Sequence, residues 1–101
     1  MRMLMHVELP IEPFNTAVRD GSAGQKIQKI LAEIKPEAAY FSEYDGHRGA
    51  TLVVNVNDAS EIPRLAEPFF LVFDAEVRFR IAMTPEDLGR ANLEESGKKW
   101  R

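Results

Sequence analysis

The chain has 101 residues, no cysteine, and 13 lysines and arginines against 16 aspartates and glutamates, for a net charge of −3. This length allows one domain with a modest core, and the lack of cysteine excludes disulfides, thiolate nucleophiles and cysteine-bound zinc. The weak negative charge argues against nucleic acid and acidic membranes as partners, and no apolar run reaches the roughly 20 residues of a membrane span. We therefore expect a single cytoplasmic domain over residues 1–101.

The N-terminal third predicts a strand and then a helix. Residues 1–9 alternate between apolar and polar side chains, as in a strand with one buried face, and Pro10 ends the pattern. A helix from Ser22 to Lys35 follows, because Ile27, Ile30, Leu31 and Ile34 recur at helical spacing. Pro13 suits a first helical turn, and the sequence leaves open whether the same helix extends upstream to it.

The central segment, Ala38 to Val56, predicts a β-hairpin. Its turn centres on Asp45-Gly46, the residue pair that a type I′ turn favours. A two-residue loop sets Tyr44 opposite His47 and Phe41 opposite Ala50. This register directs Phe41, Ala50 and their apolar neighbours toward the core, and Tyr40, Tyr44 and His47 toward the other face.

The last third predicts a helix, a strand and a terminal helix. A short helix runs from about Ser60 to Glu67 and ends at Pro68. Residues 69–73 either continue that helix or form a loop on the core, and Ala75 to Met83 alternate as a strand. Thr84 begins a C-terminal helix as its capping residue. Residues 85–101 thus form a C-terminal helix and a tail, and the tail, residues 97–101, is basic.

This order of elements is the ferredoxin-like βαββαβ arrangement, an α+β fold. Right-handed crossovers place the helices on one face of a four-stranded antiparallel sheet, with the first strand in the centre beside the last. The second sheet face is too polar for a dry core, yet Leu4, Val53 and the two tyrosines are unusual on a face open to water. We therefore expect a homodimer that packs these faces together.

His6 is the best candidate for a catalytic residue. It lies on this mixed face two positions from Glu8, so both side chains point the same way, and a histidine oriented by a carboxylate suits acid–base catalysis. The alternative is a histidine that only forms hydrogen bonds within a dimer interface. Arg78 and Arg80 share the face and would bind a small organic anion, or would pair with Glu8 and Glu76.

Three further polar side chains on the mixed face are candidates for ligand binding. Tyr40 and Tyr44 could donate hydroxyls to an oxyanion, or simply cover the sheet, and Asn55 could orient a ligand through its amide. His47 follows the tight turn, where we expect an exposed residue. The two histidines show no metal-ligand spacing, so we expect neither a metal nor another cofactor.

Several short stretches resemble the dimeric α+β barrel superfamily, and within it the muconolactone-isomerase-like proteins. They are Met3–Val7, Gly46-His47 with Ala50, Val54–Asp58, Pro68–Phe70 and Glu76-Val77. The resemblance covers most of residues 1–83 and implies a homodimer with a pocket between sheet and helices or inside the barrel. Members of this superfamily range from cofactor-free isomerases and monooxygenases to haem-dependent enzymes, so the fold leaves the reaction open.

Two hypotheses follow for the function. In the first, the protein binds a small organic ligand or acts as a non-catalytic dimeric module. In the alternative, it is a cofactor-independent isomerase, lyase or monooxygenase-like enzyme acting on a small organic acid or lactone. His6 would then be the acid–base residue, Glu8 its orienting partner, and Arg78 or Arg80 the anchor for the anion.

Overall fold

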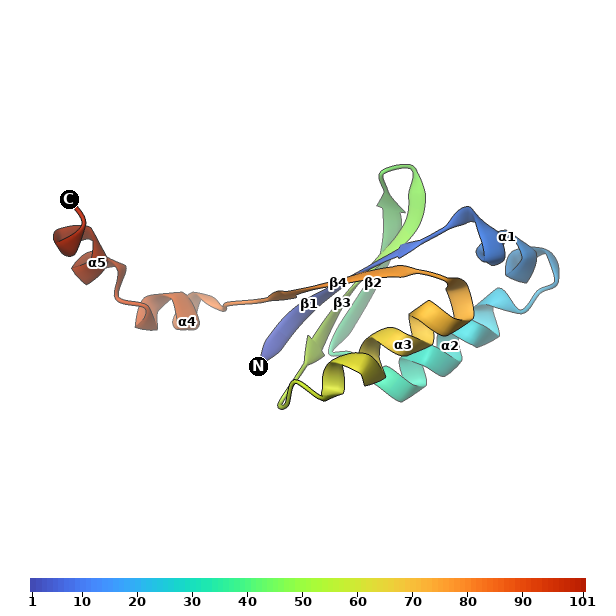
Figure 1. Ribbon diagram of the computed structural model, residues 1–101, viewed down its shortest axis with the longest axis horizontal. Helices are drawn as coiled ribbons and strands as arrows, with labels where there is room; N and C mark the ends of the chain where they lie inside the picture. Colours follow the sequence, from blue (N-terminus) through green and yellow to red (C-terminus); the bar gives the residue numbers. More distant parts are fainter.

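The computed structural model describes all 101 residues and shows a sheet with helices on one face and a C-terminal segment that extends away from it (Figure 1). The elements are β1 (Arg2–Leu9), α1 (Ile11–Arg19), α2 (Ala23–Ile34), β2 (Ala38–Tyr44), β3 (His47–Asn55), α3 (Glu61–Phe73), β4 (Glu76–Ile81), α4 (Pro85–Arg90) and α5 (Leu93–Lys99). No helix is both long enough and apolar enough to cross a membrane.

The four strands form one antiparallel sheet in the order β2-β3-β1-β4, which confirms the ferredoxin-like prediction. The hairpin register is also confirmed, with Tyr44 opposite His47 and Phe41 opposite Ala50. Asp45 and Gly46 have φ values of 51° and 79°, as the turn requires. This register decides which side chains face the helices and which face away.

The core lies between the sheet and the helices. Met5 and Val7 of β1, Leu52 of β3, and Phe69 and Phe73 of α3 are fully buried there. Phe41 points to the same side of the sheet but is 48% exposed, because it belongs to the edge strand β2. The predicted core face is therefore correct for the central strands and incomplete at the β2 edge.

The helix α3 departs from the sequence prediction. Pro68 does not end it; the helix continues to Phe73, so residues 69–73 are a helical continuation. The reason is packing: Phe69 and Phe73 lie on the same face as Leu65 and are 1% exposed. Burial of these aromatic rings outweighs the roughly 3 kcal/mol that an internal proline costs.

The C-terminal segment also differs from the prediction. Two short helices, α4 and α5, replace one helix, because Asn92 takes a left-handed conformation (φ 55°) between them. The predicted start is confirmed: Thr84 and Asp87 form a capping box around Pro85. Most of the predicted basic tail lies within α5.

Candidate functional site

The sheet face that points away from the helices, called here the open face, carries all the predicted site residues. His6 shares a hydrogen bond of 3.4 Å between its Nδ1 and the Thr51 hydroxyl. The Tyr44 ring packs edge-on against the imidazole, with the ring centroids 4.3 Å apart. The second ring nitrogen of His6, Nε2, is buried and has no hydrogen-bond partner.

Gly49 makes this contact between Tyr44 and His6 possible. It lies on β3 opposite Ser42 of β2 and Glu8 of β1, and it leaves a gap on the open face. A Cβ atom at position 49 would lie 3.1 Å from the Cβ of Tyr44. The missing side chain thus gives Tyr44 the room to lean across β3, a role that the sequence analysis missed.

Glu8 does not orient His6. Its carboxylate instead lies 3.5 Å from Nδ1 of His47 and 3.5 Å from a guanidinium nitrogen of Arg78. Arg78 also pairs with Glu76 at 3.2 Å, which is the ion pairing that the sequence analysis gave as the alternative to ligand binding. His47, expected to be exposed, is half-buried and belongs to this second cluster.

The remaining predicted ligand-binding residues are scattered over the open face. Asn55 accepts a hydrogen bond of 3.0 Å from the amino group of Met1. Tyr40 is 68% exposed, and neither its hydroxyl nor the Arg80 guanidinium makes a hydrogen bond or an ion pair. The structure therefore brings His6 together with Tyr44, and Glu8 together with His47 and Arg78. No group of three histidine, aspartate or glutamate side chains is placed to hold a metal ion.

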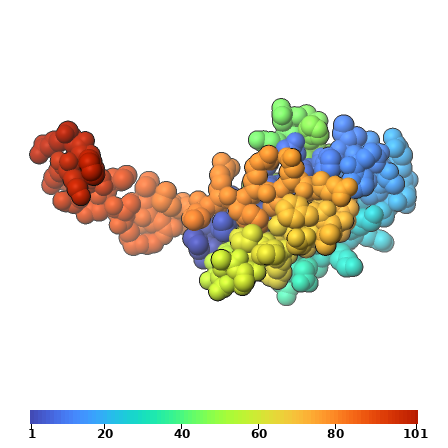
Figure 2. Space-filling view, in the orientation of Figure 1, coloured from blue at the N-terminus to red at the C-terminus, as the bar shows by residue number.

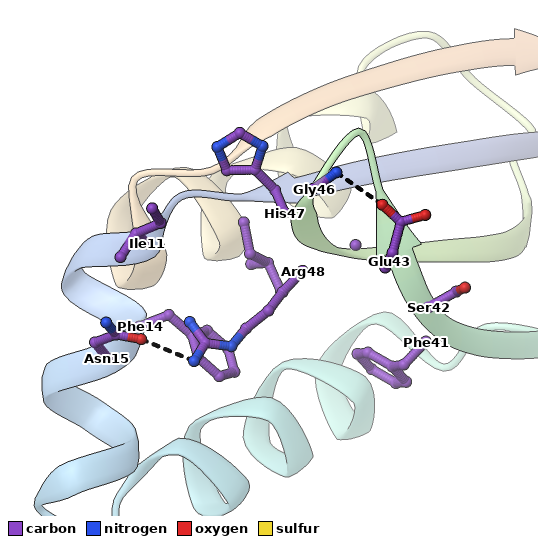
Figure 3. Close-up of a pocket in the computed structure, with 11 residues that line it drawn as sticks. Ile11, Phe14, Asn15, Phe41, Ser42, Glu43, Gly46, His47 and Arg48 are labelled. Atoms are coloured by element: carbon purple, nitrogen blue, oxygen red, sulfur yellow. Dashed lines mark hydrogen bonds between the residues drawn. The ribbon is translucent and has the colours of Figure 1, made fainter.

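The largest pocket lies on the opposite side of the sheet, where α1 faces the β2–β3 hairpin (Figure 3). This hairpin cleft has a volume of about 720 Å³ and is open to solvent. Its walls are Leu9, Ile11, Phe14, Asn15, Phe41, Ser42, Glu43, Gly46, His47, Arg48 and Gly49. Apolar side chains from three segments of the chain thus meet a few polar groups, as in many ligand sites.

Arg48 is held in position at the wall of the hairpin cleft. Its guanidinium donates a hydrogen bond of 2.8 Å to the Asn15 side chain and lies 4.7 Å from the centre of the Phe14 ring. Glu43 is directly opposite on β2, but its carboxylate accepts a hydrogen bond from the Gly46 backbone, 2.7 Å away. Arg48 therefore makes no ion pair with a carboxylate, and its positive charge faces the cleft.

One carboxylate near the cleft is held in its ionised form. The Thr16 hydroxyl has the largest effect on the pKa of Glu12 and lowers it; burial comes next and raises it, and the Thr16 backbone N–H lowers it. The charges of Arg19 and Arg48 lower this pKa further. Glu12 pairs with Arg19 rather than Arg48, so it moderates the positive charge of the cleft without occupying it.

No protein-family model matches the chain, and no curated protein matches it. Among solved structures, it is similar to 5-chloro-2-hydroxyhydroquinone dehydrochlorinase (TftG) from Burkholderia phenoliruptrix in complex with 2,5-dihydroxybenzoquinone. The identity is 12% over 85% of this chain and 97% of that chain, with a TM-score of 0.55. A designed protein, Ferredog-Diesel, is 9% identical over 80% of this chain and 85% of its own, with a TM-score of 0.45.

The strand order and the similarity to TftG define the fold class, a small α+β protein with the ferredoxin-like βαββαβ arrangement. The βαββαβ fold that the resemblance implied is thereby confirmed, whereas the superfamily and the dimer stay predictions. Membership of the muconolactone-isomerase-like branch stays a prediction, because 12% identity carries no information beyond the fold.

Proposed function

We propose that this protein binds a small planar organic anion in the hairpin cleft, with Arg48 as the anchor. The observation that carries the proposal is the guanidinium of Arg48, held by Asn15 and Phe14 and not paired with any carboxylate. A planar, pre-oriented guanidinium binds carboxylates and enolates through two parallel hydrogen bonds. Phe41 and Ile11, 48% and 59% exposed, supply apolar surface for the rest of the ligand.

The ligand of TftG agrees with this chemistry. 2,5-Dihydroxybenzoquinone is a flat ring whose hydroxyl groups behave as vinylogous carboxylic acids and ionise at neutral pH. Such a molecule combines the two properties that the hairpin cleft is suited to bind, a delocalised negative charge and an aromatic face. It is therefore the first probe to use on this chain.

The test is calorimetric titration of the full chain with 2,5-dihydroxybenzoquinone and with benzoate. We expect Arg48→Met to weaken binding by about tenfold or more, and Arg48→Lys to recover only part of the loss, because lysine keeps the charge without the planar fork. Arg64→Met is the matched control, since Arg64 is an exposed arginine of α3 outside the cleft. Equal binding by Arg48→Met would refute the proposal, as would no binding of either anion by the unaltered chain.

A second candidate function is proton transfer by His6, as the sequence analysis expected for an enzyme without cofactors. Nε2 of His6 has no hydrogen-bond partner, which supports this function; the atom is buried, so a substrate would have to displace a neighbouring side chain to reach it. Tyr40, Tyr44 and Arg80 make no hydrogen bonds and are free to contact a small organic acid or lactone, whereas Asn55 and Arg78 would have to exchange partners. Glu8 would act on this site through Arg78 and not through His6.

Deuterium incorporation tests this second candidate. A panel of lactones and unsaturated organic acids is incubated with the protein in D₂O and followed by NMR. Exchange that is catalysed by the unaltered chain and by His47→Ala, and lost in His6→Ala, would support His6 as the acid–base residue. Exchange that survives His6→Ala would exclude it.

We also propose that two copies associate through the open face. Leu4, Val53 and the exposed rings of Tyr40 and Tyr44 give this face more apolar surface than a water-facing sheet needs. Sedimentation of Val53→Lys should show a weaker dimer than the unaltered chain. The control is Val18→Lys, on the exposed side of α1, which should leave association unchanged.

A further inference from the structure

The C-terminal arm, defined here as residues 82–101, stands away from the rest of the molecule (Figure 2). It lengthens the chain to 60 Å, against 29 and 19 Å in the other directions. The radius of gyration is 17.1 Å, whereas a compact domain of this length has about 13 Å. The domain and the arm are therefore separate bodies within one chain.

The helices of the arm cannot owe their stability to their own sequence. α4 and α5 have six and seven residues, and isolated helices shorter than about 12 residues are marginal in water. Neither helix has a buried residue, and Leu88, Leu93 and Trp100 are 45%, 61% and 78% exposed. Ordered short helices with apolar side chains need a surface that covers them.

The solvent-accessible surface area indicates how much of the chain a partner would bury. The chain exposes 7054 Å², whereas a compact monomer of 11.4 kDa exposes about 5,800 Å². The excess, about 1,300 Å² per chain, is larger than the roughly 800 Å² that each partner contributes to a stable interface. The excess is therefore large enough to supply one partner's share of an interface of ordinary size.

The charge of the arm narrows the class of partner. Residues 85–101 hold four acidic and four basic side chains, so the two helices together are neutral. A nucleic acid or an acidic membrane would require a basic segment. A neutral, amphipathic segment is instead suited to a protein surface, and it adds no repulsion when a chain of net charge −3 meets its own copy.

We propose that the arm docks on a second copy of this chain, and that the two copies exchange arms. The proposal rests on the homodimer proposed above. The arm leaves the domain from β4, an edge strand of the sheet whose open face is the other uncovered surface. In a dimer with two-fold symmetry, the arm and the open face of each copy can both be covered, because each copy makes the same contacts to the other.

Trp100, the one tryptophan of the chain, reports on this docking directly. The experiment follows its fluorescence and the sedimentation of the full-length protein over the same concentration range. We expect the emission to shift to shorter wavelength as the dimer forms, since the exposed indole becomes covered by the second copy. On dilution to the monomer, the emission should return to that of a solvated tryptophan.

Substitutions in the arm distinguish docking of the arm from association through the open face. Leu93→Glu should weaken the dimer by about tenfold and keep Trp100 solvated at concentrations where the unaltered chain is dimeric. Leu71→Glu is the control, since Leu71 is equally apolar and 78% exposed but lies on α3. It should change neither readout.

Each remaining outcome overturns the proposal in a recognisable way. A dimer in which Trp100 stays solvated, and in which Leu93→Glu has no effect, would refute arm exchange and leave the open-face dimer standing. A monomer at every concentration would refute both proposals. A shielded Trp100 in the monomer would place the arm on its own domain and refute the exchange.

Discussion

At the scale of single residues, Gly49 controls the environment of His6. A methyl group at this position would meet the Tyr44 Cβ at 3.1 Å and two backbone oxygens at 3.4 Å. Gly49→Ala should therefore push Tyr44 off the imidazole and destabilise the protein by about 1–3 kcal/mol, as overpacking does. Urea unfolding measures the loss, and the NMR chemical shifts of the His6 ring report the loss of the Tyr44 contact.

Gly24→Ala provides the matched control for this substitution. Gly24 lies in α2 with nothing within 4 Å of the added methyl group. Alanine is the better helix former, so this variant should gain about 0.5–1 kcal/mol and leave His6 unchanged. If both glycine variants were destabilised equally, the close approach at Gly49 would not be the cause.

The sequence predicts on which sheet face a site residue lies, but not which side chains it contacts. Alternation along β1 and β4 placed His6, Glu8 and Arg78 on one face correctly, because side chains of a strand alternate strictly. It could not reveal partners: Glu8 is nearer to side chains on the neighbouring strands than to His6 on its own strand. The hairpin cleft escaped notice because its walls come from α1 and the hairpin, segments far apart in sequence.

At the level of elements, boundaries decided by neighbouring residues were predicted well, and the end of α3, which tertiary packing decides, was not. The Asp45-Gly46 turn and the Thr84 capping box behave as their sequences predict, because each is decided by neighbouring residues. Pro68 does not act as a helix end, since the buried rings of Phe69 and Phe73 hold the helix together beyond it. Such tertiary packing is not encoded in any local pattern.

Replacing Pro68 should therefore stabilise α3. Proline lacks the N–H that would donate to the Arg64 carbonyl, so Pro68→Ala restores one helical hydrogen bond and should add about 2 kcal/mol to the free energy of unfolding. Pro63→Ala is the control, because Pro63 lies in the first turn, where no helical acceptor is lost. It should change stability by less than about 1 kcal/mol. A loss of stability in Pro68→Ala would mean that contacts of the proline ring outweigh the missing bond.

The start of α3 should make stability sensitive to acid. The backbone N–H groups of Asn57 and Asp58 donate to the Glu61 carboxylate at 2.7 and 2.8 Å and lower its pKa. A lowered folded-state pKa stabilises the protein above the ordinary value of about 4.3, and this contribution disappears as the pH falls through the folded-state pKa.

Glu61→Gln should therefore be less stable than the unaltered chain at neutral pH and lose less stability on acidification. Urea unfolding at several pH values between neutral and strongly acidic measures both effects. Glu33→Gln is the control, because the Glu33 carboxylate makes no hydrogen bond or ion pair. An unchanged pH dependence in Glu61→Gln would show that the capping carboxylate does not contribute.

At the scale of the whole molecule, the domain is complete without its C-terminal arm. Every buried hydrophobic side chain lies between Met5 and Ala75, and the two arm helices bury nothing in this chain. Deleting residues 85–101 should therefore leave the free energy of unfolding of the dilute, separated chain unchanged within about 0.5 kcal/mol. Urea unfolding at low protein concentration is the measurement.

The same deletion should change the shape and association of the protein. The radius of gyration should fall from 17.1 Å to the roughly 12 Å of a compact domain of 84 residues, which X-ray scattering measures. The melting temperature of the full chain should rise with concentration, because association stabilises the folded state by mass action. In the shortened chain this rise should be smaller, because only the open face remains to associate. A large loss of stability in the dilute shortened chain would instead show that the arm stabilises its own domain, which would require contacts between α4 or α5 and the core.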